Sequence, residues 1–268
     1  GRTMRRPVSA LTIAGSDSGG GAGIQADLHA FAAYRVHGLS AIAATTAQNT
    51  RGVASVHRIP GAHLEAQVAS VFDDFRIGAV KTGMLGTAAT VRTVARALAA
   101  RAVPLVVDPV MIATSGAALL APDAVRAVAT ELLPLATLAT PNVPEAERLT
   151  GLRIAHERDV DAACDALLAR GAQAVLLKGG HLPGPRIVDV LRTRDARVAV
   201  RHARLAREGH GTGCTLAAAI AAQLARGVAL TDAVRDAVAY VHGALRHGTR
   251  PGRGNVTVLD HYWRRFAR

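Results

Sequence analysis

The sequence predicts an α/β protein with a mostly parallel central sheet that is covered by helices on both faces. Short apolar runs, typical of buried strands, alternate along the chain with longer stretches of helical pattern. Glycines or polar residues follow most of the apolar runs, and in a parallel sheet such positions share one edge. Half of the 268 residues are hydrophobic but only 3% are aromatic, so we expect a core of Ala, Val, Leu and Ile.

The first half of the chain supplies the clearest alternation. An apolar run at residues 8–14 predicts a strand, and the glycine-rich stretch after it leads into a helical pattern. The strands expected in this half are residues 8–14, 39–46, 53–59, 77–81 and 104–107, the third of them a short extra strand. The expected helices are residues 24–35, 63–75 and 87–100, the last one rich in alanine.

The second half continues the alternation without a linker rich in Pro or Ser and without an internal repeat. We therefore expect one domain over residues 8–268, after a disordered tail at residues 1–7. The expected strands are residues 135–140 and 174–177, followed by a small hairpin of residues 187–191 and 198–201. The expected helices are residues 122–133, 159–170, 212–225 and 231–246.

The charge pattern bears on the class of partner. The 32 basic and 20 acidic residues leave a net charge of +12. The arginines are scattered and do not alternate with aromatic residues, which disfavours a nucleic-acid surface and favours a small anionic substrate. The two cysteines form no disulfide framework, and no apolar run is long enough to span a bilayer. We expect a cytoplasmic protein with neither nucleic acid nor membrane as partner.

A glycine-rich turn at residues 209–215 is where we expect the chemistry. It leads directly into an uninterrupted helical run, so several unpaired backbone N–H groups and the helix dipole point the same way. This arrangement suits a phosphate or a developing oxyanion. Cys214 lies in the turn, where a helix N-terminus lowers the pKa of a thiol and prepares it as a nucleophile or base. The alternative is a helix cap beside a small buried cysteine.

A second glycine-rich loop, residues 15–23, also lies between a strand and a helix. Residues 21–26 match the loose dinucleotide fingerprint, but the next strand lacks the acidic residue that a dehydrogenase needs. The loop has no Gly-Lys-Ser/Thr ending either, which excludes a P-loop. We interpret it as a loop that lets the backbone approach a substrate closely.

Lysine is rare in this arginine-rich chain. Only Lys81 and Lys178 occur, and each lies at or just after the end of a predicted strand. A lysine that persists where arginine is favoured hints at a need for a compact, mobile ammonium group.

Taken together, the strand-end segments resemble the ribokinase superfamily and, most closely, its branch of hydroxymethylpyrimidine and phosphomethylpyrimidine kinases. The segments that carry the resemblance are residues 12–28, 47–50, 80–85, 107–111, 140–145, 177–181 and 210–215. The resemblance covers nearly the whole chain. It implies a ribokinase-like three-layer α/β/α sandwich with little or no separate lid.

The activity implied by the resemblance is ATP-dependent and Mg²⁺-dependent phosphorylation of 4-amino-5-hydroxymethyl-2-methylpyrimidine, and then of its monophosphate, in thiamine biosynthesis. A homodimer is implied as well. Pyridoxal or pyridoxine kinase on the same fold is the alternative within this class. A non-catalytic ligand-binding protein is the alternative outside it.

The resemblance also implies roles for the residues that match. Cys214 takes the proton of the substrate hydroxyl, and the backbone N–H groups of Gly211, Thr212 and Gly213 face the transferring phosphoryl group. Lys178 contacts the phosphates of ATP, as does Thr212, and the alternative for Lys178 is an ordinary surface lysine.

The metal is expected at three further positions. Asn142 and Glu145 hold Mg²⁺ through water and phosphate, unless they only cap a helix. Asp108 assists the metal or the phosphates, unless it is an ordinary turn residue before proline.

For the acceptor, the resemblance points to Asp27 and Gln48, whose carboxylate and amide suit the edge of an aminopyrimidine. The alternative for Asp27 is a plain acidic residue in a first helical turn. Gly15, Met84 and Val110 are expected to form the walls around the ring. Lys81 is left as a residue behind the site.

The chain departs from the family pattern at two places. Thr114 stands where the family usually has Lys or a similar residue, and residues 205–209 replace the usual Asp-Thr-x-Asn-Thr before the catalytic turn. That segment borders the nucleotide, so we expect altered ATP contacts there, with Arg207 offsetting the charge of Glu208.

Overall fold

The computed structural model describes residues 7–265 and is built on a nine-stranded sheet in the order β3-β2-β1-β4-β5-β6-β7-β8-β9. The expected tail lies outside the described residues except for Pro7, which is exposed. The strands are β1 Ser9–Asp17, β2 His37–Asn49, β3 Gly52–Arg58, β4 Ile77–Thr82, β5 Leu105–Val107, β6 Leu138–Ala139, β7 Ala174–Leu177, β8 Arg186–Thr193 and β9 Arg197–Ala203.

The strands from β2 to β7 in sheet order all run parallel, whereas the pairs β2–β3, β7–β8 and β8–β9 are antiparallel. The mostly parallel sheet is therefore confirmed. The expected extra strand is β3, which pairs antiparallel with β2. The expected small hairpin is β8 and β9, which extend the main sheet rather than standing apart from it. A short parallel pair, β10 Gly209–His210 and β11 Thr257–Val258, was not expected.

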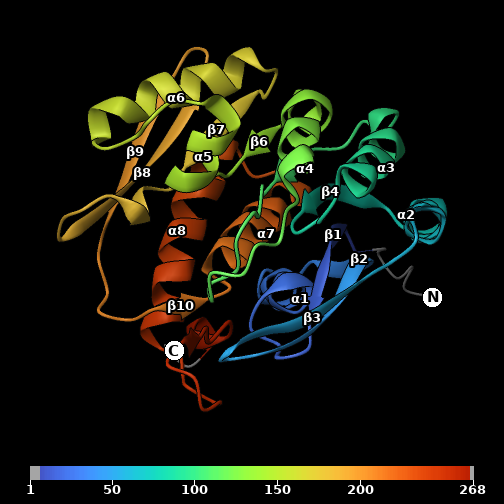
Figure 1. Ribbon diagram of the computed structural model, residues 1–268, viewed down its shortest axis with the longest axis horizontal. Coiled ribbons are helices and arrows are strands. Elements are labelled where there is room, and N and C mark those ends of the chain that lie inside the picture. Colours follow the sequence, from blue (N-terminus) through green and yellow to red (C-terminus); the bar gives the residue numbers. More distant parts are fainter. Residues whose placement is uncertain (1–6, 266–268) are drawn as a thin grey trace, which may run out of the picture.

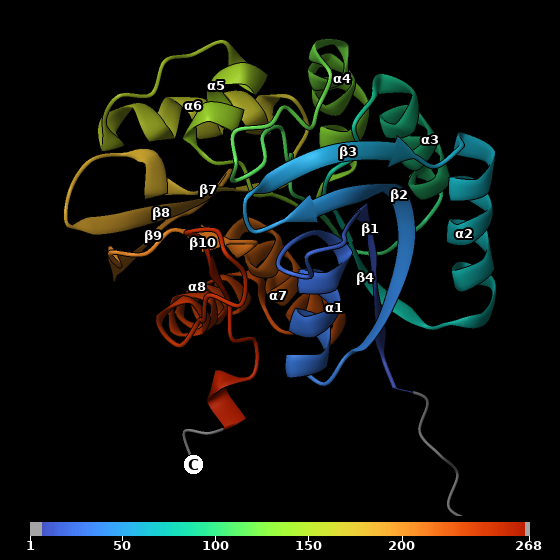
Figure 2. The ribbon, with the colours of Figure 1, turned by 60° about the horizontal axis from the view of Figure 1, so that its bottom comes forward.

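Helices cover both faces of the sheet (Figures 1 and 2). One layer holds α1 Gly23–Ala33, α7 Thr212–Ala225 and α8 Leu230–Arg246, which pack side by side. The other layer holds α2 Gly61–Asp74, α3 Ala88–Ala99, α4 Pro122–Ala127, α5 Val143–Thr150 and α6 Glu157–Ala169. The architecture is the three-layer α/β/α sandwich that the sequence predicts.

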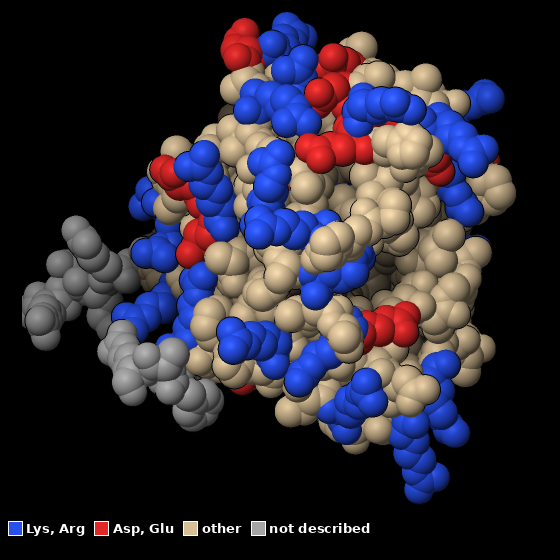
Figure 3. All heavy atoms as spheres, turned by 90° about the vertical axis from the view of Figure 1, so that its left-hand side faces the viewer, with Lys and Arg blue, Asp and Glu red and all other residues tan. Residues whose placement is uncertain are grey.

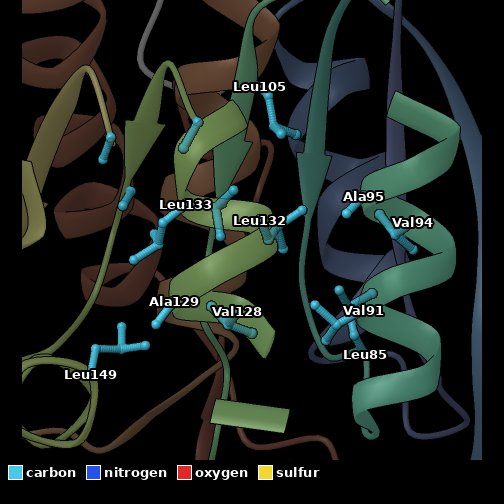
Figure 4. Close-up of a cluster of buried hydrophobic side chains, with 14 of the residues drawn as sticks. Leu85, Val91, Val94, Ala95, Leu105, Val128, Ala129, Leu132, Leu133 and Leu149 are labelled. Atoms are coloured by element: carbon cyan, nitrogen blue, oxygen red, sulfur yellow. The ribbon is translucent and has the colours of Figure 1, made fainter. Parts of the chain in front are cut away.

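Each helical layer buries its own apolar core against the sheet. Figure 4 shows the larger one, where α3 meets the segment after α4. Val91, Val94, Ala95 and Leu98 of α3 repeat at helical spacing and are buried. The opposite core is dominated by the alanines of α7, whose small side chains let this helix lie close to the sheet.

The sequence was least accurate near residues 122–150. The expected helix 122–133 is regular only as far as Ala127, and it continues as a π-helical segment, Val128–Leu132, and a 3-10 turn, Leu133–Leu135. Pro134 supplies no N–H for a regular α-helix there. The expected strand 135–140 shortens to β6, and helix α5 was missed.

Figure 3 shows basic side chains scattered over one face among acidic ones, without a continuous basic band. In the described part of the chain, no helix combines the length and the apolar character that crossing a membrane requires.

Candidate active site

A cavity of about 570 Å³ lies at the edge where the parallel strands end. It is lined by the glycine-rich loop after β1, by the residues that follow β4 to β7, and by the N-terminus of α7. Of the residues singled out in the sequence, the following line it: Gly15, Gln48, Met84, Asp108, Val110, Asn142, Glu145, Lys178, Gly211, Thr212, Gly213 and Cys214. One expected residue, Asp27, is not among them.

The catalytic turn has the conformation that an anion site needs. Gly211 has φ 79° and precedes α7, and no side chain caps this helix end. A Cβ on Gly211 would collide with the carbonyl oxygen of Gly21, so the turn and the glycine-rich loop touch through their backbones. The first N–H groups of α7 have no carbonyl of their own helix to bond and remain open to an anion.

Cys214 lies where the N-termini of α1 and α7 meet, and the backbone N–H of Gly23 donates to its sulfur. Burial raises the pKa of the Cys214 thiol to about 11, although the ammonium of Lys81 and the Gly23 N–H act in the other direction. The expectation of a lowered pKa is wrong for the protein without ligands, because desolvation outweighs the effect of the helix terminus.

Lys178 and Asp108 lie over the catalytic turn. The ammonium nitrogen is 3.3 Å from Oδ1 of Asp108, which also accepts from the hydroxyl of Thr140 at 3.1 Å. A Cβ placed on Gly213 would lie 3.1 Å from Nζ of Lys178 and 3.8 Å from Oδ2 of Asp108. The lysine therefore stands beside the open N–H groups, where a phosphate would be held by both.

Asn142 and Glu145 form a capping box at the start of α5. The Asn142 side chain accepts from the Glu145 N–H, and the Glu145 carboxylate accepts from the Asn142 N–H, both at 2.9 Å. Burial raises the pKa of Glu145 to about 7; the charge of Lys178 opposes this shift, and that of Asp108 adds to it. The helix-capping alternative is thus realised, and both side chains still line the cavity.

These acidic groups suit only a metal that keeps other ligands. Among the described residues, no three His, Cys, Asp or Glu side chains are close enough together to hold a metal ion. Asp108 and Glu145 nevertheless face the same cavity beside Lys178. This set fits Mg²⁺ that retains water and binds mainly to the phosphates of a nucleotide.

The residues expected to form the walls around the acceptor all line this cavity. A Cβ on Gly15 would come within 3.0 Å of the terminal methyl of Met84, so the absence of a side chain at Gly15 lets Met84 pack against β1. Val110 follows β5 and lines the same space. The amide of Gln48, near the end of β2, is 3.2 Å from the hydroxyl of Thr46 and 3.3 Å from Nε2 of His210.

Asp27 is the one expected acceptor residue that does not line the cavity. Its side chain is fully buried and lies 2.9 Å from Nζ of Lys81, while the hydroxyl of Thr12 donates to it at 2.6 Å. The carboxylate has no free position for a substrate. Burial alone would lower the pKa of Lys81, but the charge of Asp27 raises it overall. The pair sits behind Cys214 as a buried structural element.

Two residues that line the cavity were missed as site residues. The carboxylate of Asp17 accepts from the N–H groups of Gly19, Gly21 and Ala22 and so shapes the glycine-rich loop. His210, directly before the catalytic turn, contacts that carboxylate at 3.0 Å. Both lie inside segments that the sequence had singled out, an acid in the glycine-rich loop and a histidine before the turn.

The unusual segment before the turn is anchored by two arginines. The guanidinium of Arg204 donates to the carbonyls of Gly180, Leu182 and Gly184 at 2.6–2.8 Å. Arg207 donates to the carbonyls of Arg246 and Gly248, and it lines the cavity together with Glu208. These bonds to backbone carbonyls hold residues 205–209 at the border of the cavity.

Residues 17–259 match the sequence profile of the phosphomethylpyrimidine kinase family. The chain belongs to this family. It is 49% identical to the hydroxymethylpyrimidine/phosphomethylpyrimidine kinase of Rhizobium meliloti, with 95% of this chain and 98% of that protein covered. Identity to the protein of the same name from Streptomyces coelicolor is also 49%, with 96% and 95% covered.

Solved structures agree on the fold. The ADP complex of Bacillus subtilis pyridoxal kinase superposes with a TM-score of 0.89 at 33% identity, covering 97% of this chain and 99% of that one. Phosphomethylpyrimidine kinase from Clostridium difficile gives a TM-score of 0.79 at 41% identity, covering 88% and 98%. The ribokinase-like fold is thereby confirmed.

Proposed function

We propose that this protein transfers a phosphoryl group from ATP to 4-amino-5-hydroxymethyl-2-methylpyrimidine, and a second one to the monophosphate, in thiamine biosynthesis. The single observation that carries the proposal is that one cavity joins the catalytic turn and Cys214 to two sets of side chains. Lys178 and Asp108 lie beside Gly213 of the turn, and Gly15, Gln48 and Met84 line the same cavity.

In the first reaction the hydroxymethyl oxygen of the acceptor forms a bond to the γ-phosphorus of ATP, the bond to the β,γ-bridging oxygen breaks, and ADP leaves. The N–H groups of Gly211, Thr212 and Gly213, with Lys178, stabilise charge on the transferring group. Mg²⁺, when bound, neutralises phosphate charge, and Asp108, Asn142 and Glu145 are the residues that would hold it through water. Cys214 takes the proton of the hydroxyl.

The raised pKa of Cys214 makes its role testable. If only the thiolate accepts the proton, kcat/KM rises with pH through the neutral range, because the active form grows toward the pKa of about 11. We expect Cys214→Ala to bind the acceptor normally, to lose about 10²- to 10⁴-fold in kcat, and to show a flatter pH profile. Full activity in this variant would reject the base role.

The acceptor profile tests the whole proposal. A coupled assay with ATP and Mg²⁺ compares hydroxymethylpyrimidine, its monophosphate and pyridoxal at matched concentrations. Pyridoxal kinase is the second candidate, because pyridoxal kinases superpose on the chain with TM-scores of 0.88–0.89. Turnover with pyridoxal and none with the pyrimidine would replace the first proposal with the second.

The domain organisation, assembly and location of the protein are also proposals. A single domain over residues 8–268 is supported by the continuous sheet and by the cavity, which is lined from both halves of the chain. A homodimer is supported by β3, which pairs only with β2 among the described residues and so offers a free sheet edge. Light scattering of the purified protein tests the dimer, and fractionation of cells tests the cytoplasmic location.

A further inference from the structure

His210 contacts residues of three other segments that line the cavity. Its Nε2 lies 3.0 Å from Oδ2 of Asp17 and 3.3 Å from Nε2 of Gln48, and its Nδ1 lies 3.3 Å from the hydroxyl of Thr114. The side chains of His210 and Asp17 are only 9% and 3% exposed. Water cannot readily replace these contacts, so each ring nitrogen must donate or accept as its neighbouring group requires.

The surroundings of Asp17 determine which ring nitrogen carries a hydrogen. The carboxylate already accepts from three backbone N–H groups at 2.7–3.0 Å. Burial alone would raise the pKa of Asp17, but the hydrogen bonds from His210, Gly19 and Ala22 lower it overall. An ionised carboxylate only accepts, so Nε2 of His210 carries a hydrogen and donates it, whether the ring is neutral or charged.

The amide of Gln48 lies between His210 and Thr46, and both neighbours select one orientation. The Thr46 hydroxyl donates its single hydrogen to the carbonyl of Ser16 at 2.9 Å. The same hydroxyl can therefore only accept a hydrogen bond from Gln48. Once Nε2 of His210 carries a hydrogen it has no lone pair, so it cannot accept from the Gln48 amide; its one hydrogen is shared between Asp17 at 3.0 Å and Gln48 at 3.3 Å. A side-chain amide turns by 180° without displacing other atoms, so its oxygen can face His210 and its nitrogen Thr46.

We propose that His210, held by Asp17, is a positioning residue that fixes the amide of Gln48 with its oxygen toward the imidazole and its nitrogen toward Thr46. One lone pair of the oxygen and one N–H then remain for a ligand, in a fixed order. An aminopyrimidine edge also has an order, an amino donor beside a ring nitrogen acceptor. His210 therefore contributes to selecting the acceptor without touching it. This inference rests on the proposed function, in which Gln48 reads the pyrimidine.

A pair of amide substitutions tests the positioning role. His210→Gln can place a donor N–H near the former Nε2, whereas His210→Asn reaches only the former Nδ1. With Asn, the Gln48 amide is released, and we expect the KM for hydroxymethylpyrimidine to rise about 10-fold or more while the KM for ATP stays unchanged. With Gln, the acceptor KM should stay within about 3-fold of the wild-type value. His63→Gln, exposed on α2, is the matched control.

Equal losses in the two variants, or a parallel rise in the KM for ATP, would assign His210 a purely structural role and overturn the proposal. A second measurement needs no acceptor. The ¹⁵N shifts of the His210 ring, assigned by comparison with His210→Gln, should show a hydrogen on Nε2. A bare Nε2 would overturn the proposal even if the pyrimidine is the substrate, whereas failure to phosphorylate the pyrimidine would overturn the proposed function and leave this measurement intact.

Discussion

The two lysines of the chain form two aspartate pairs that look alike in sequence and differ in the structure. Lys81 lies inside β4, and its pair with Asp27 is fully buried beneath α1. Lys178 comes directly after β7, and its pair with Asp108 is 16% and 2% exposed and faces the cavity. Lys81 is the residue before the last one of β4, whereas Lys178 is the first residue after β7, and this difference of two positions separates a sealed pair from one that can receive a phosphate.

The comparison shows how the fold divides its charged groups. A sealed ion pair gains little net stability, because desolvation offsets the attraction, but it is costly to break. An open pair can exchange its partner for a ligand at low cost. Lys81 is also near Cys214, whose pKa it lowers against the effect of burial. The sealed pair thus places a buried charge behind the catalytic turn, and the open pair places one beside the turn at the cavity.

Breaking the sealed pair should have the largest effect. Lys81→Met leaves the Asp27 carboxylate buried with only the Thr12 hydroxyl, and we expect the free energy of unfolding to fall by about 3–5 kcal/mol. Urea denaturation measures the change.

The double variant Asp27→Leu/Lys81→Met controls for the lost packing of the lysine. It removes both charges and should recover most of the stability. An equally unstable double variant would mean that packing, not the pair, dominates. Recovery also allows activity to be measured without the fixed charge behind Cys214.

Breaking the open pair should affect catalysis and leave stability nearly intact. Lys178→Met removes a cation beside the N–H groups of the catalytic turn, and we expect kcat/KM for ATP to fall about 10²- to 10³-fold. The free energy of unfolding should change by about 1 kcal/mol or less, because water in the cavity can solvate Asp108. A loss of stability as large as that of Lys81→Met would erase the distinction between the two pairs.

The sequence was sufficient to predict the layers, most of the strands and the edge where the site lies. The alternation of strands with helices and the polar residues that follow the strands can both be recognised from local sequence alone. It overextended the strand at residues 135–140, and it missed α5, which begins at a capping box that had been read mainly as a metal site. Short central strands such as β6 are held by their neighbours and have little pattern of their own.

Asp27 shows what the sequence contained and what it could not resolve. Ile24, Ala30 and Phe31 are the buried face of α1, and Asp27 falls on the same face at helical spacing. That pattern indicates a buried acid in need of a partner, and Lys81 was one of only two lysines available. Which of the two pairs opens on the cavity depends on how far each strand extends beneath the helices, and no local pattern encodes this distance.

Asp17 and His210 were not predicted as site residues because their contact joins positions 193 residues apart in the sequence.

The last prediction concerns the pH dependence of stability near the open pair. Burial holds the pKa of Glu145 at about 7 rather than the ordinary 4.5, so between these values the folded protein keeps a proton that the unfolded chain releases. The contribution of Glu145 to stability is therefore present below pH 4.5 and is lost as the pH rises toward 7. Glu145→Gln has no carboxyl group to titrate, so its stability should not fall over this pH range. The difference in free energy of unfolding between wild type and variant should therefore change between pH 4.5 and about 7 and be constant above that range. Saturating MgATP should shift this pH range, because a ligand bound at the Lys178–Asp108 pair changes the electrostatic environment of the Glu145 carboxyl group. A difference that is independent of pH would show that Glu145 is ionised throughout, with Lys178 shared between two carboxylates.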